Sequence, residues 1–496
     1  MGARSQGRAG RVVAVAVFLT AAIAAGLVLR PSHEQTSPAG QPLPTDLVHR
    51  STFSEAFGLL QTVRELPDGR LLVADPLGRI LAAIDLETGA TEPVGREGGG
   101  PGEWRQPDAV YPLPGDSSLL VDLENTRLSV LDPDGNFVRG YPMALLPTGP
   151  ASGGEAGPGT ASGSAAGTRA AGARTSRTGS PGGQMAGAMA RAQSPGGALA
   201  VQILHPRATD ALGRVYYQAR PRGIPGAATG EVADSSEVRR WGMNDEPPVR
   251  LAGLRPPALA SAGSGGPGQG MVSMRPMPLA HQDDWAVASD GSVAVVRAEP
   301  YHVEWLRPDG SVAVGPPVHY EPVPVSTAEK ERWLEAVSAG ITMMISVSGG
   351  ATDVQVGRGR SGMVPASAQG GLDDYEWPAL LPPFRSGGAR VDDVGRLWVE
   401  RYSQVGDPVV YDIFNEHGER ISRARLPRDR RIIGFGDGVA FVVHVDDLGL
   451  NRLEVYELPA PQPTGTGQTQ RKPGAGRGAV PRALPPSLEG ALARQG

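Results

Sequence analysis

Polar and aromatic side chains follow directly after two apolar segments of this chain, residues 293–296 and 397–399. Guanidinium, carboxyl, imidazole and phenol groups that converge at a concave place are typical of a ligand site. We therefore predict that these side chains end inner strands and line the mouth of a central channel. The candidate ligand-binding residues are Arg297, Tyr301, His302, Glu400, Arg401 and Tyr402.

Catalytic and metal-binding signatures are missing from the sequence. The eight histidines form neither a His-x-x-x-His nor a His-Glu-x-x-His pattern, and no Gly-x-Ser-x-Gly elbow occurs. The chain has no cysteine, which excludes disulfides, thiolate metal sites and a cysteine nucleophile. No catalytic residue is predicted, and an enzymatic role is disfavoured.

Paired aspartates are the remaining candidates for a cofactor. Carboxylates suit calcium, but two of the four pairs fall at expected turns, where a carboxylate more often caps the backbone. We expect no cofactor and no metal site, with calcium left open. The pairs are Asp283-Asp284, Asp373-Asp374, Asp392-Asp393 and Asp446-Asp447.

Short apolar runs separated by Gly-containing turns carry these residues. Asp68-Gly69 and Asp134-Gly135 each stand at such a turn, and both residue types tolerate the positive φ of tight hairpins. Helical periodicity is absent from these runs, so the pattern predicts consecutive antiparallel hairpins.

A unit of about 40 residues recurs about six times between residues 52 and 460. Each unit can form a four-stranded sheet, which buries both faces only by packing against neighbours around an axis. The sequence therefore predicts an all-β fold, a six-bladed β-propeller. Residues 326–337 break the pattern with good helix formers, and Ser326 and Glu329 are spaced for a capping box.

Tracts poor in large apolar residues interrupt or follow the repeats. Residues 147–200 and 461–496 are rich in Gly, Ala, Pro and Arg and cannot bury enough surface to offset ordering entropy. We expect a disordered insertion within the propeller and a disordered tail.

The first thirty residues have the form of an export signal. Arg4, Arg8 and Arg11 precede an apolar run over residues 12–29, and both a cleaved signal peptide and an uncleaved membrane anchor stay open. Residues 31–51 would be a linker. The remainder would lie outside the cytoplasmic membrane, in the periplasm or the extracellular space, with the membrane as a partner of the N-terminal helix.

One repeat has a specific motif. A Gly-rich turn with Gly100, Pro101 and Gly102 leads to Trp104, and a strand then leads to Asp122-x-x-Asn125-x-Arg127. This pattern resembles the NHL repeat and bacterial six-bladed propellers that have Phe at the place of Trp104. The resemblance implies a propeller fold.

The residues of this motif have structural roles on physical grounds. Trp104 is expected to fill the space between two blades, and Asp122 to pair with Arg127 across a hairpin. Gly100, Pro101 and Gly102 would shape the crossing between blades, and Asn125 belongs to the same structural motif. Recognising the motif therefore brings no catalytic residue with it.

Net charge and composition disfavour some classes of function but do not identify one. A net charge of -5 without a basic domain disfavours nucleic-acid binding. We expect a monomeric, exported, non-catalytic propeller that binds a protein, peptide or glycan or acts as a scaffold. The alternative is a hydrolase or lyase, since the resemblance extends to lactonases and lyases. A lactonase of that kind implies a central metal cluster, for which only Glu400 and Asn451 are candidates.

Overall fold

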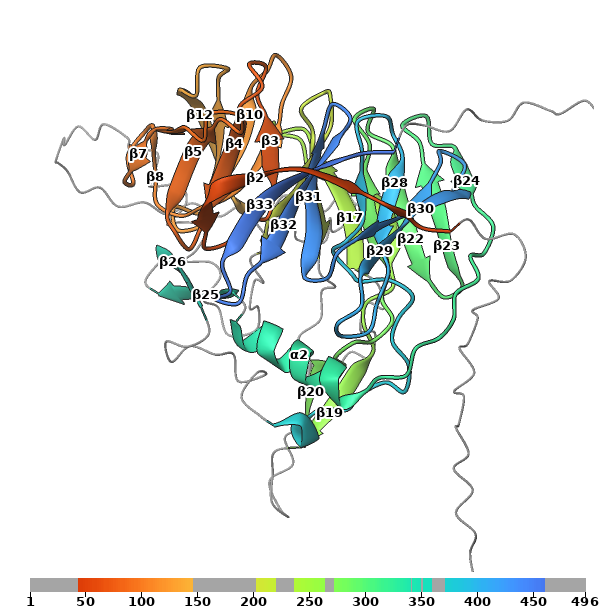
Figure 1. The fold of residues 1–496 in the computed structure, drawn as a ribbon. Helices are drawn as coiled ribbons and strands as arrows, with labels where there is room; N and C mark the ends of the chain where they lie inside the picture. Colours follow the sequence, from red (N-terminus) through yellow and green to blue (C-terminus); the bar gives the residue numbers. More distant parts are fainter. Residues whose placement is uncertain are drawn as a thin grey trace, which may run out of the picture. The chain divides into compact units, whose positions relative to one another are not determined.

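The computed structural model describes residues 43–145, 202–219, 236–263, 272–339, 341–348, 351–358 and 371–459. The chain divides into a unit of residues 1–43 and a unit of residues 44–496. The second unit contains six four-stranded antiparallel assemblies and is a six-bladed β-propeller, which confirms the predicted fold (Figure 1). The predicted N-terminal helix and both predicted disordered tracts lie outside the described residues.

The first three blades follow the chain in order. Blade 1 consists of β3 (Val63–Glu65), β4 (Leu71–Asp75), β5 (Ile80–Ile84) and β6 (Thr91–Pro93). Blade 2 consists of β9 (Pro107–Pro112), β10 (Ser118–Asp122), β11 (Arg127–Leu131) and β12 (Phe137–Pro142). Blade 3 consists of β15 (Pro206–Thr209), β16 (Val215–Ala219), β17 (Ser236–Trp241) and β18 (Val249–Leu254).

The last three blades complete the ring. Blade 4 consists of β21 (Asp284–Val287), β22 (Val293–Ala298), β23 (Tyr301–Leu306) and β24 (Val312–Val314). Blade 5 consists of β27 (Arg390–Val391), β28 (Leu397–Glu400), β29 (Val409–Phe414) and β30 (Arg420–Leu426). Blade 6 consists of β31 (Arg430–Gly436), β32 (Val439–Val445), β33 (Asn451–Glu457) and the N-terminal β2 (Val48–Phe57).

The first strand of each blade is its innermost strand. Strand β9 packs against β3 and β15, β21 packs against β15 and β27, and β3 packs against β31. Because strands of different blades meet in this way at β3, β9, β15, β21, β27 and β31, these six strands surround the axis of the propeller.

Blade 6 is closed by a strand from the other end of the chain. β2 pairs antiparallel with β33, and β1 (Thr45–Asp46) pairs parallel with β30 of blade 5 (Figure 1). Phe53 and Phe57 of β2 are buried against Leu453 and Val455. The predicted linker of residues 31–51 therefore ends too late, because strands of the propeller already begin at Thr45.

Six apolar clusters hold the blades together, one at each boundary between neighbouring blades. Strands β4, β10, β16, β22, β28 and β32 supply their fully buried Val, Leu and Ala residues. Both faces of each sheet are thus covered, which removes apolar area from water at about 25 cal/mol per Å². A lone blade would leave both of its faces exposed.

Four two-stranded pairs lie outside the blades. They are β7 (Arg96–Glu97) with β8 (Glu103–Trp104), β13 (Ala144–Leu145) with β14 (Gln202–Ile203), β19 (Leu259–Gly263) with β20 (Val272–Pro276), and β25 (Ile341–Ser348) with β26 (Ala351–Arg358).

The predicted mid-chain helix is confirmed as α2 (Thr327–Ala339), in the connection between blades 4 and 5. Glu329 accepts hydrogen bonds from both the backbone N–H and the hydroxyl of Ser326, the residue before the helix, which is the Glu half of a capping box. The 3-10 turn η2 (Leu372–Asp374) follows in the same connection. Within the described part of the chain, no helix is long and apolar enough to cross a membrane.

Candidate functional site

Charged residues stand at the N-terminal ends of the innermost strands. Asp108 and Arg207 are each the extra residue of a β-bulge, where the pairing of β9 with β10 and of β15 with β16 shifts by one position. A bulge leaves its extra residue out of the ladder and redirects its side chain. Both side chains thereby reach residues of neighbouring blades.

The Asp108 carboxylate joins blades 1, 2 and 3. It accepts a hydrogen bond from Gln61 Nε2 at 2.6 Å, and its second oxygen lies 2.9 Å from His205 Nε2. Asp108 is almost fully buried, whereas the His205 side chain is 41 % exposed. The carboxylate therefore fixes one ring nitrogen and leaves the rest of the imidazole partly open to solvent.

The Asp284 carboxylate joins blades 3, 4 and 5. One of its oxygens lies 2.6 Å from Arg207 Nη1 and the other accepts hydrogen bonds from the amides of Gly387 and Ala389. The Arg207 guanidinium also lies over the ring of Trp285, 5.0 Å from its centre. This carboxylate is thus engaged at both oxygens, by an ion pair at one and by two backbone amides at the other.

Two arginines of blades 5 and 6 have no such carboxylate. Arg390 donates from Nη1 to the Gly387 carbonyl at 3.4 Å, and Arg431 donates from Nη2 to the Leu60 carbonyl at 2.7 Å. Within the described ranges, neither forms an ion pair, and Arg390 Nε is buried without a hydrogen-bond partner. Both residues have intermediate exposure.

The surroundings of Arg390 and Arg431 disfavour the charged form of their guanidinium groups. Burial and then the nearby Arg207 lower the pKa of Arg390. Burial and then the nearby Arg390 lower the pKa of Arg431 to about 10. Both guanidinium groups stay protonated at neutral pH, so each carries a positive charge that is poorly compensated.

Glu400 lies beside these arginines at the end of β28. Its Oε1 is 2.9 Å from Arg385 Nε, and Tyr411 donates its hydroxyl to Oε2 at 3.3 Å. Tyr411 in turn accepts a hydrogen bond from the Ile432 amide at 3.0 Å. Burial raises the pKa of Glu400, and attraction to Arg385 only partly offsets this.

We call this set of residues the central polar cluster. Its members lie around the innermost strands, and each influences neighbouring members through its charge or a hydrogen bond. They are Asp108, His205, Arg207, Asp284, Arg390, Glu400, Tyr411 and Arg431. Asp284 compensates Arg207 and Arg385 compensates Glu400, while Arg390 and Arg431 keep unpaired charge. The arrangement suits an anionic group, since arginine binds planar or tetrahedral anions with paired N–H donors.

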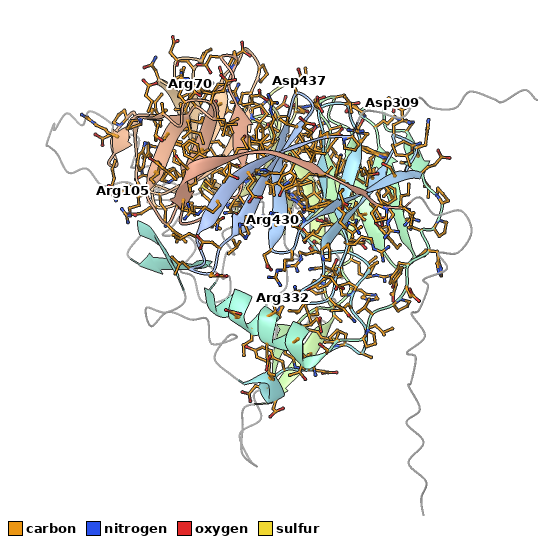
Figure 2. All side chains as sticks on the ribbon, in the orientation of Figure 1. Arg70, Arg105, Asp309, Arg332, Arg430 and Asp437 are labelled. Carbon is orange, nitrogen blue, oxygen red and sulfur yellow. The ribbon has the colours of Figure 1, made fainter. Side chains whose placement is uncertain are left out.

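Helix α2 lies on the same side of the blades as the cluster. Arg332 of α2 donates to the carbonyl of Ser403, which lies two residues after Arg401, at 3.2 Å. Figure 2 shows Arg332 and Arg430 on this side of the blades. Glu329 also accepts a hydrogen bond from the Val405 amide. The helix is thereby attached to the loop that follows Glu400.

The predicted site residues do not all meet at one place. β22 and β28 are the second strands of their blades, so residues at their ends are not inner-strand ends as expected. The apolar runs before Arg297 and Glu400 form these second strands, whereas the strand before each run holds the innermost position. Burial of both sheet faces gives second strands the stronger apolar signal.

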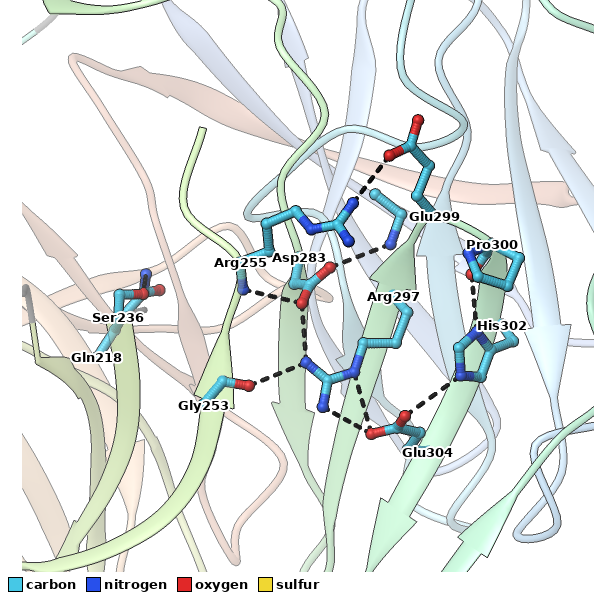
Figure 3. A network of polar contacts seen from close by, with 11 residues as sticks. Gln218, Ser236, Gly253, Arg255, Asp283, Arg297, Glu299, Pro300, His302 and Glu304 are labelled. Atoms are coloured by element: carbon cyan, nitrogen blue, oxygen red, sulfur yellow. Dashed lines mark hydrogen bonds and ion pairs between the residues drawn. The ribbon is translucent and has the colours of Figure 1, made fainter. Parts of the chain in front are cut away.

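Arg297 and His302 belong to a network between blades 3 and 4 (Figure 3). Arg297 donates to the Gly253 carbonyl at 2.9 Å, to Asp283 at 2.8 Å and to Glu304 through two nitrogens. His302 lies 3.3 Å from Glu304. The Arg297 donors that the structure describes are directed at protein acceptors.

Tyr301 and Arg401 belong to a second network, between blades 4 and 5. The Tyr301 hydroxyl donates to Asp412 at 3.0 Å, and Arg401 lies 3.8 Å from the same carboxylate. Arg420 and Arg423 also lie within 4 Å of Asp412. These side chains join blades, which differs from the predicted ligand contact.

Glu400 and Tyr402 lie at the central polar cluster. Tyr402 stands over Arg385, with the guanidinium carbon 5.1 Å from the ring centre. Burial raises the pKa of Tyr402, and Arg385 and Arg332 lower it in part. Of the six predicted ligand-binding residues, Glu400 is therefore placed beside the unpaired arginines, and Tyr402 lies beside Arg385.

The residues of the repeat motif are placed in structural roles. Trp104 is buried between blades 1 and 2 and donates from Nε1 to the Val94 carbonyl at 2.8 Å. Asp122 accepts a hydrogen bond from the Gln106 amide and another from Asn125 Nδ2. Arg127 lies 3.7 Å from Asp122 and donates to the Gly100 carbonyl.

The turn before Trp104 is held by the Glu103 side chain. The Gly100 amide donates to Glu103, and Gly102 has a φ of 75°, which favours glycine at that place. Pro101 stands between them and donates no hydrogen bond. The turn thus sets the path by which the chain crosses from blade 1 to blade 2.

The aspartate pairs at turns cap the backbone. Asp392 accepts from the Arg396 amide, Arg396 Nε and Trp398 Nε1, and Asp446 accepts from the amides of Leu448 and Leu450. In the described ranges no three His, Asp or Glu side chains are grouped so as to hold a metal ion.

Glu400 and Asn451 do not fit the metal cluster of a lactonase. Glu400 is engaged by Arg385 and Tyr411, and Asn451 Oδ1 accepts the Leu60 amide at 3.0 Å. Both candidate ligands are thus occupied by protein donors, and these two residues do not form a calcium site.

Sequence reasoning missed most of the cluster. The missed residues share one position, the first two residues of an innermost strand or the segment just before it, and they are Asp108, His205, Arg207, Asp284, Arg390 and Arg431. Aligning the six units on their turns and comparing the residues that precede each apolar run would have revealed the recurrent charge.

Comparison with known proteins finds only distant similarities. No family model matches the chain, and no curated protein matches it, so the NHL resemblance rests on the motif residues alone. A gluconolactonase of Xanthomonas campestris is 11% identical over 86% of this chain and 99% of its own, with a TM-score of 0.32.

Other solved structures are similarly distant. The calcium-binding protein regucalcin of Agrobacterium tumefaciens is 11% identical over 84% of this chain and 99% of its own, with a TM-score of 0.33. Virginiamycin B lyase of Staphylococcus aureus is 8% identical over 83% and 88%, with a TM-score of 0.28. The six-bladed β-propeller is established by the strand pairing of the chain itself, and these distant similarities carry no argument about its activity.

Proposed function

We propose that this chain is an exported propeller that binds an anionic ligand, or an anionic group of a larger partner, at the central polar cluster. Export rests on the charged and apolar pattern of the first thirty residues. The binding role follows from Arg390 and Arg431, whose charges lack a carboxylate partner among the described residues.

The two unpaired arginines carry this proposal. A partly buried charge without a counter-charge is costly, and a bound anion would remove that cost while satisfying the free Arg390 Nε. The acidic residues near these two arginines already form ion pairs with other arginines. Asp284 pairs with Arg207, and Glu400 pairs with Arg385. An anion from outside the chain is therefore the group that completes the cluster.

A hydrolase or lyase is the second candidate. One observation favours it: Glu400 combines a raised pKa with a position beside the proposed anion site, as a proton-transfer group requires. The described residues supply no activated nucleophile next to it. We therefore propose binding as the function and keep proton transfer as an additional property of the same site.

Calorimetric titration of the full chain with sulfate and with oxalate tests the proposal. The two probes stand for tetrahedral and planar dicarboxylate anions, and ionic strength is held constant so that non-specific screening stays equal. Replacing either unpaired arginine, by Arg390→Gln or Arg431→Gln, is expected to weaken binding at least about tenfold, since a hydrogen bond to a charged group contributes roughly 1.5–3 kcal/mol.

Arg428→Gln provides the matched control. It removes the same charge from an exposed position outside the cluster and is expected to leave the affinity unchanged. Equal affinities for the three variants, or no binding of either probe by the unchanged protein, would contradict the proposal.

A further inference from the structure

Glu400 is a buried carboxyl group with few partners. It is 7% exposed, and it has one ion pair, with the half-exposed Arg385, and one long hydrogen bond, from Tyr411. A buried carboxylate that is stable in its charged form usually accepts two or three good hydrogen bonds. Burial therefore disfavours the charged form of Glu400 and raises its pKa, and the nearby cations balance this only in part.

The groups that face Glu400 come from four elements and are mostly cationic. Arg390 of β27 and Arg431 of β31 attract its negative charge without pairing with it, and Arg385 precedes β27. Tyr411 of β29 donates to it, and Tyr402 follows it in the chain. Arg332 and Glu329 of α2 interact electrostatically with Tyr402.

An anion bound to Arg390 and Arg431 would change this balance. It would neutralise two of the cations that attract the Glu400 carboxylate and place a like charge beside it. Both effects favour the protonated form, because like charges that share a buried site cannot both stay ionised at low cost. The neutral carboxyl would also gain an O–H that can donate to an oxygen of the ligand.

We infer that binding of an anion at the central polar cluster is coupled to the uptake of a proton by Glu400. This inference rests on the proposed anion-binding function and deepens it, because it makes Glu400 the residue that sets the dependence of affinity on pH. By linkage, if the anion promotes protonation then protonation promotes binding of the anion to the same extent. The site would hold its ligand more tightly in acid and release it as the pH rises.

Sulfate is the probe for this coupling, because it keeps its charge between pH 5 and 8. Calorimetric titrations are made at one pH and one ionic strength in two buffers of different ionisation enthalpy, and the difference in heat gives the number of protons taken up. We expect uptake approaching one proton per sulfate, and an affinity that falls by up to about tenfold for each unit by which the pH rises.

Glu400→Gln is expected to bind sulfate without proton uptake and with little dependence on pH. Glu304→Gln changes another part-buried carboxyl that is paired with an arginine, outside the cluster, and is expected to keep the full uptake. Arg385→Gln alters an exposed side chain and so spares the fold. It should shift proton uptake to higher pH, because it removes the one ion pair of the carboxylate.

The possible outcomes distinguish a failure of the proton coupling from a failure of the proposed anion binding. Sulfate binding without proton uptake overturns the coupling and leaves the anion site intact. Uptake that persists in Glu400→Gln and disappears in His205→Gln assigns the proton to the imidazole and also overturns the inference. Absence of sulfate and oxalate binding overturns the proposed function itself.

Discussion

Arg207 lies 2.6 Å from Asp284, and this ion pair crosses the boundary between blades 3 and 4. The same carboxylate accepts two amides of the segment that leads into blade 5. Asp108 makes the equivalent connection among blades 1, 2 and 3. Polar side chains at the start of the innermost strands therefore link blades near the axis, while apolar clusters link them farther out.

Removal of the Asp284 carboxylate is expected to destabilise the whole propeller. Asp284→Ala leaves Arg207 without its partner and two backbone amides without an acceptor. Breaking a buried pair by removing one member costs roughly 3–5 kcal/mol. Urea denaturation followed by tryptophan fluorescence should show a lower free energy of unfolding by about this amount.

The control for this variant is Asp437→Ala. Asp437 is exposed at a turn of blade 6, and its replacement should change the free energy of unfolding by less than about 0.5 kcal/mol. If both variants unfold at the same urea concentration, the link between blades 3, 4 and 5 does not contribute to stability.

Closure of the ring by β2 gives a second prediction. Deleting residues 1–58 removes the outer strand of blade 6, exposes the edge of β33 and uncovers the cluster that buries Phe53 and Phe57. An unpaired strand edge beside exposed apolar surface favours association. The deleted protein is expected to lose cooperative unfolding and to aggregate.

Deletion of residues 1–42 is the matched comparison, because it leaves β1 and β2 in place. It should unfold cooperatively at nearly the urea concentration of the full chain. A cooperative, monomeric product of the longer deletion, seen by size-exclusion chromatography, would contradict the role of β2 in closure.

The sequence predicts the architecture because turns and strand alternation are local signals. Asp68-Gly69 is predicted correctly without the structure, since the positive φ of Gly69 is a property of the turn itself. Trp104 is predicted correctly as an inter-blade side chain because a large aromatic beside a Gly-rich turn has few other places to go. The capping of α2 by Ser326 and Glu329 is local in the same sense.

The site depends on which strand lies next to the axis, and local patterns do not carry that information. β27 has two residues and β28 has four fully buried ones, so the apolar signal marks β28 and the central position falls to β27. Arg297 follows an apolar run and Arg390 precedes one. Only the order of strands places Arg297 between blades and Arg390 beside the axis.

Acid sensitivity should arise at the network of blades 3 and 4. Burial raises the pKa of Glu304, but hydrogen bonds and attraction from Arg297 outweigh it, so that the pKa lies below its ordinary value of 4.5. A group whose pKa is lowered by folding contributes stability above its unfolded pKa and loses it as the pH falls through the folded value. The contribution of Glu304 is thus complete at pH 7 and declines below about pH 4.5.

Glu304→Gln tests the direction of this pH dependence of stability. At pH 7 the variant should unfold with a free energy lower by roughly 1.5–3 kcal/mol, the usual contribution of hydrogen bonds to a charged group. At pH 3 the difference between the two proteins should shrink, because the native carboxyl is then increasingly protonated. Glu87→Gln, at an exposed turn, controls for the change in net charge and should show no such convergence. A difference that stays constant from pH 7 to pH 3 would mean that Glu304 acts through its shape and packing, and that its ion pair with Arg297 adds nothing to the stability of the blade boundary.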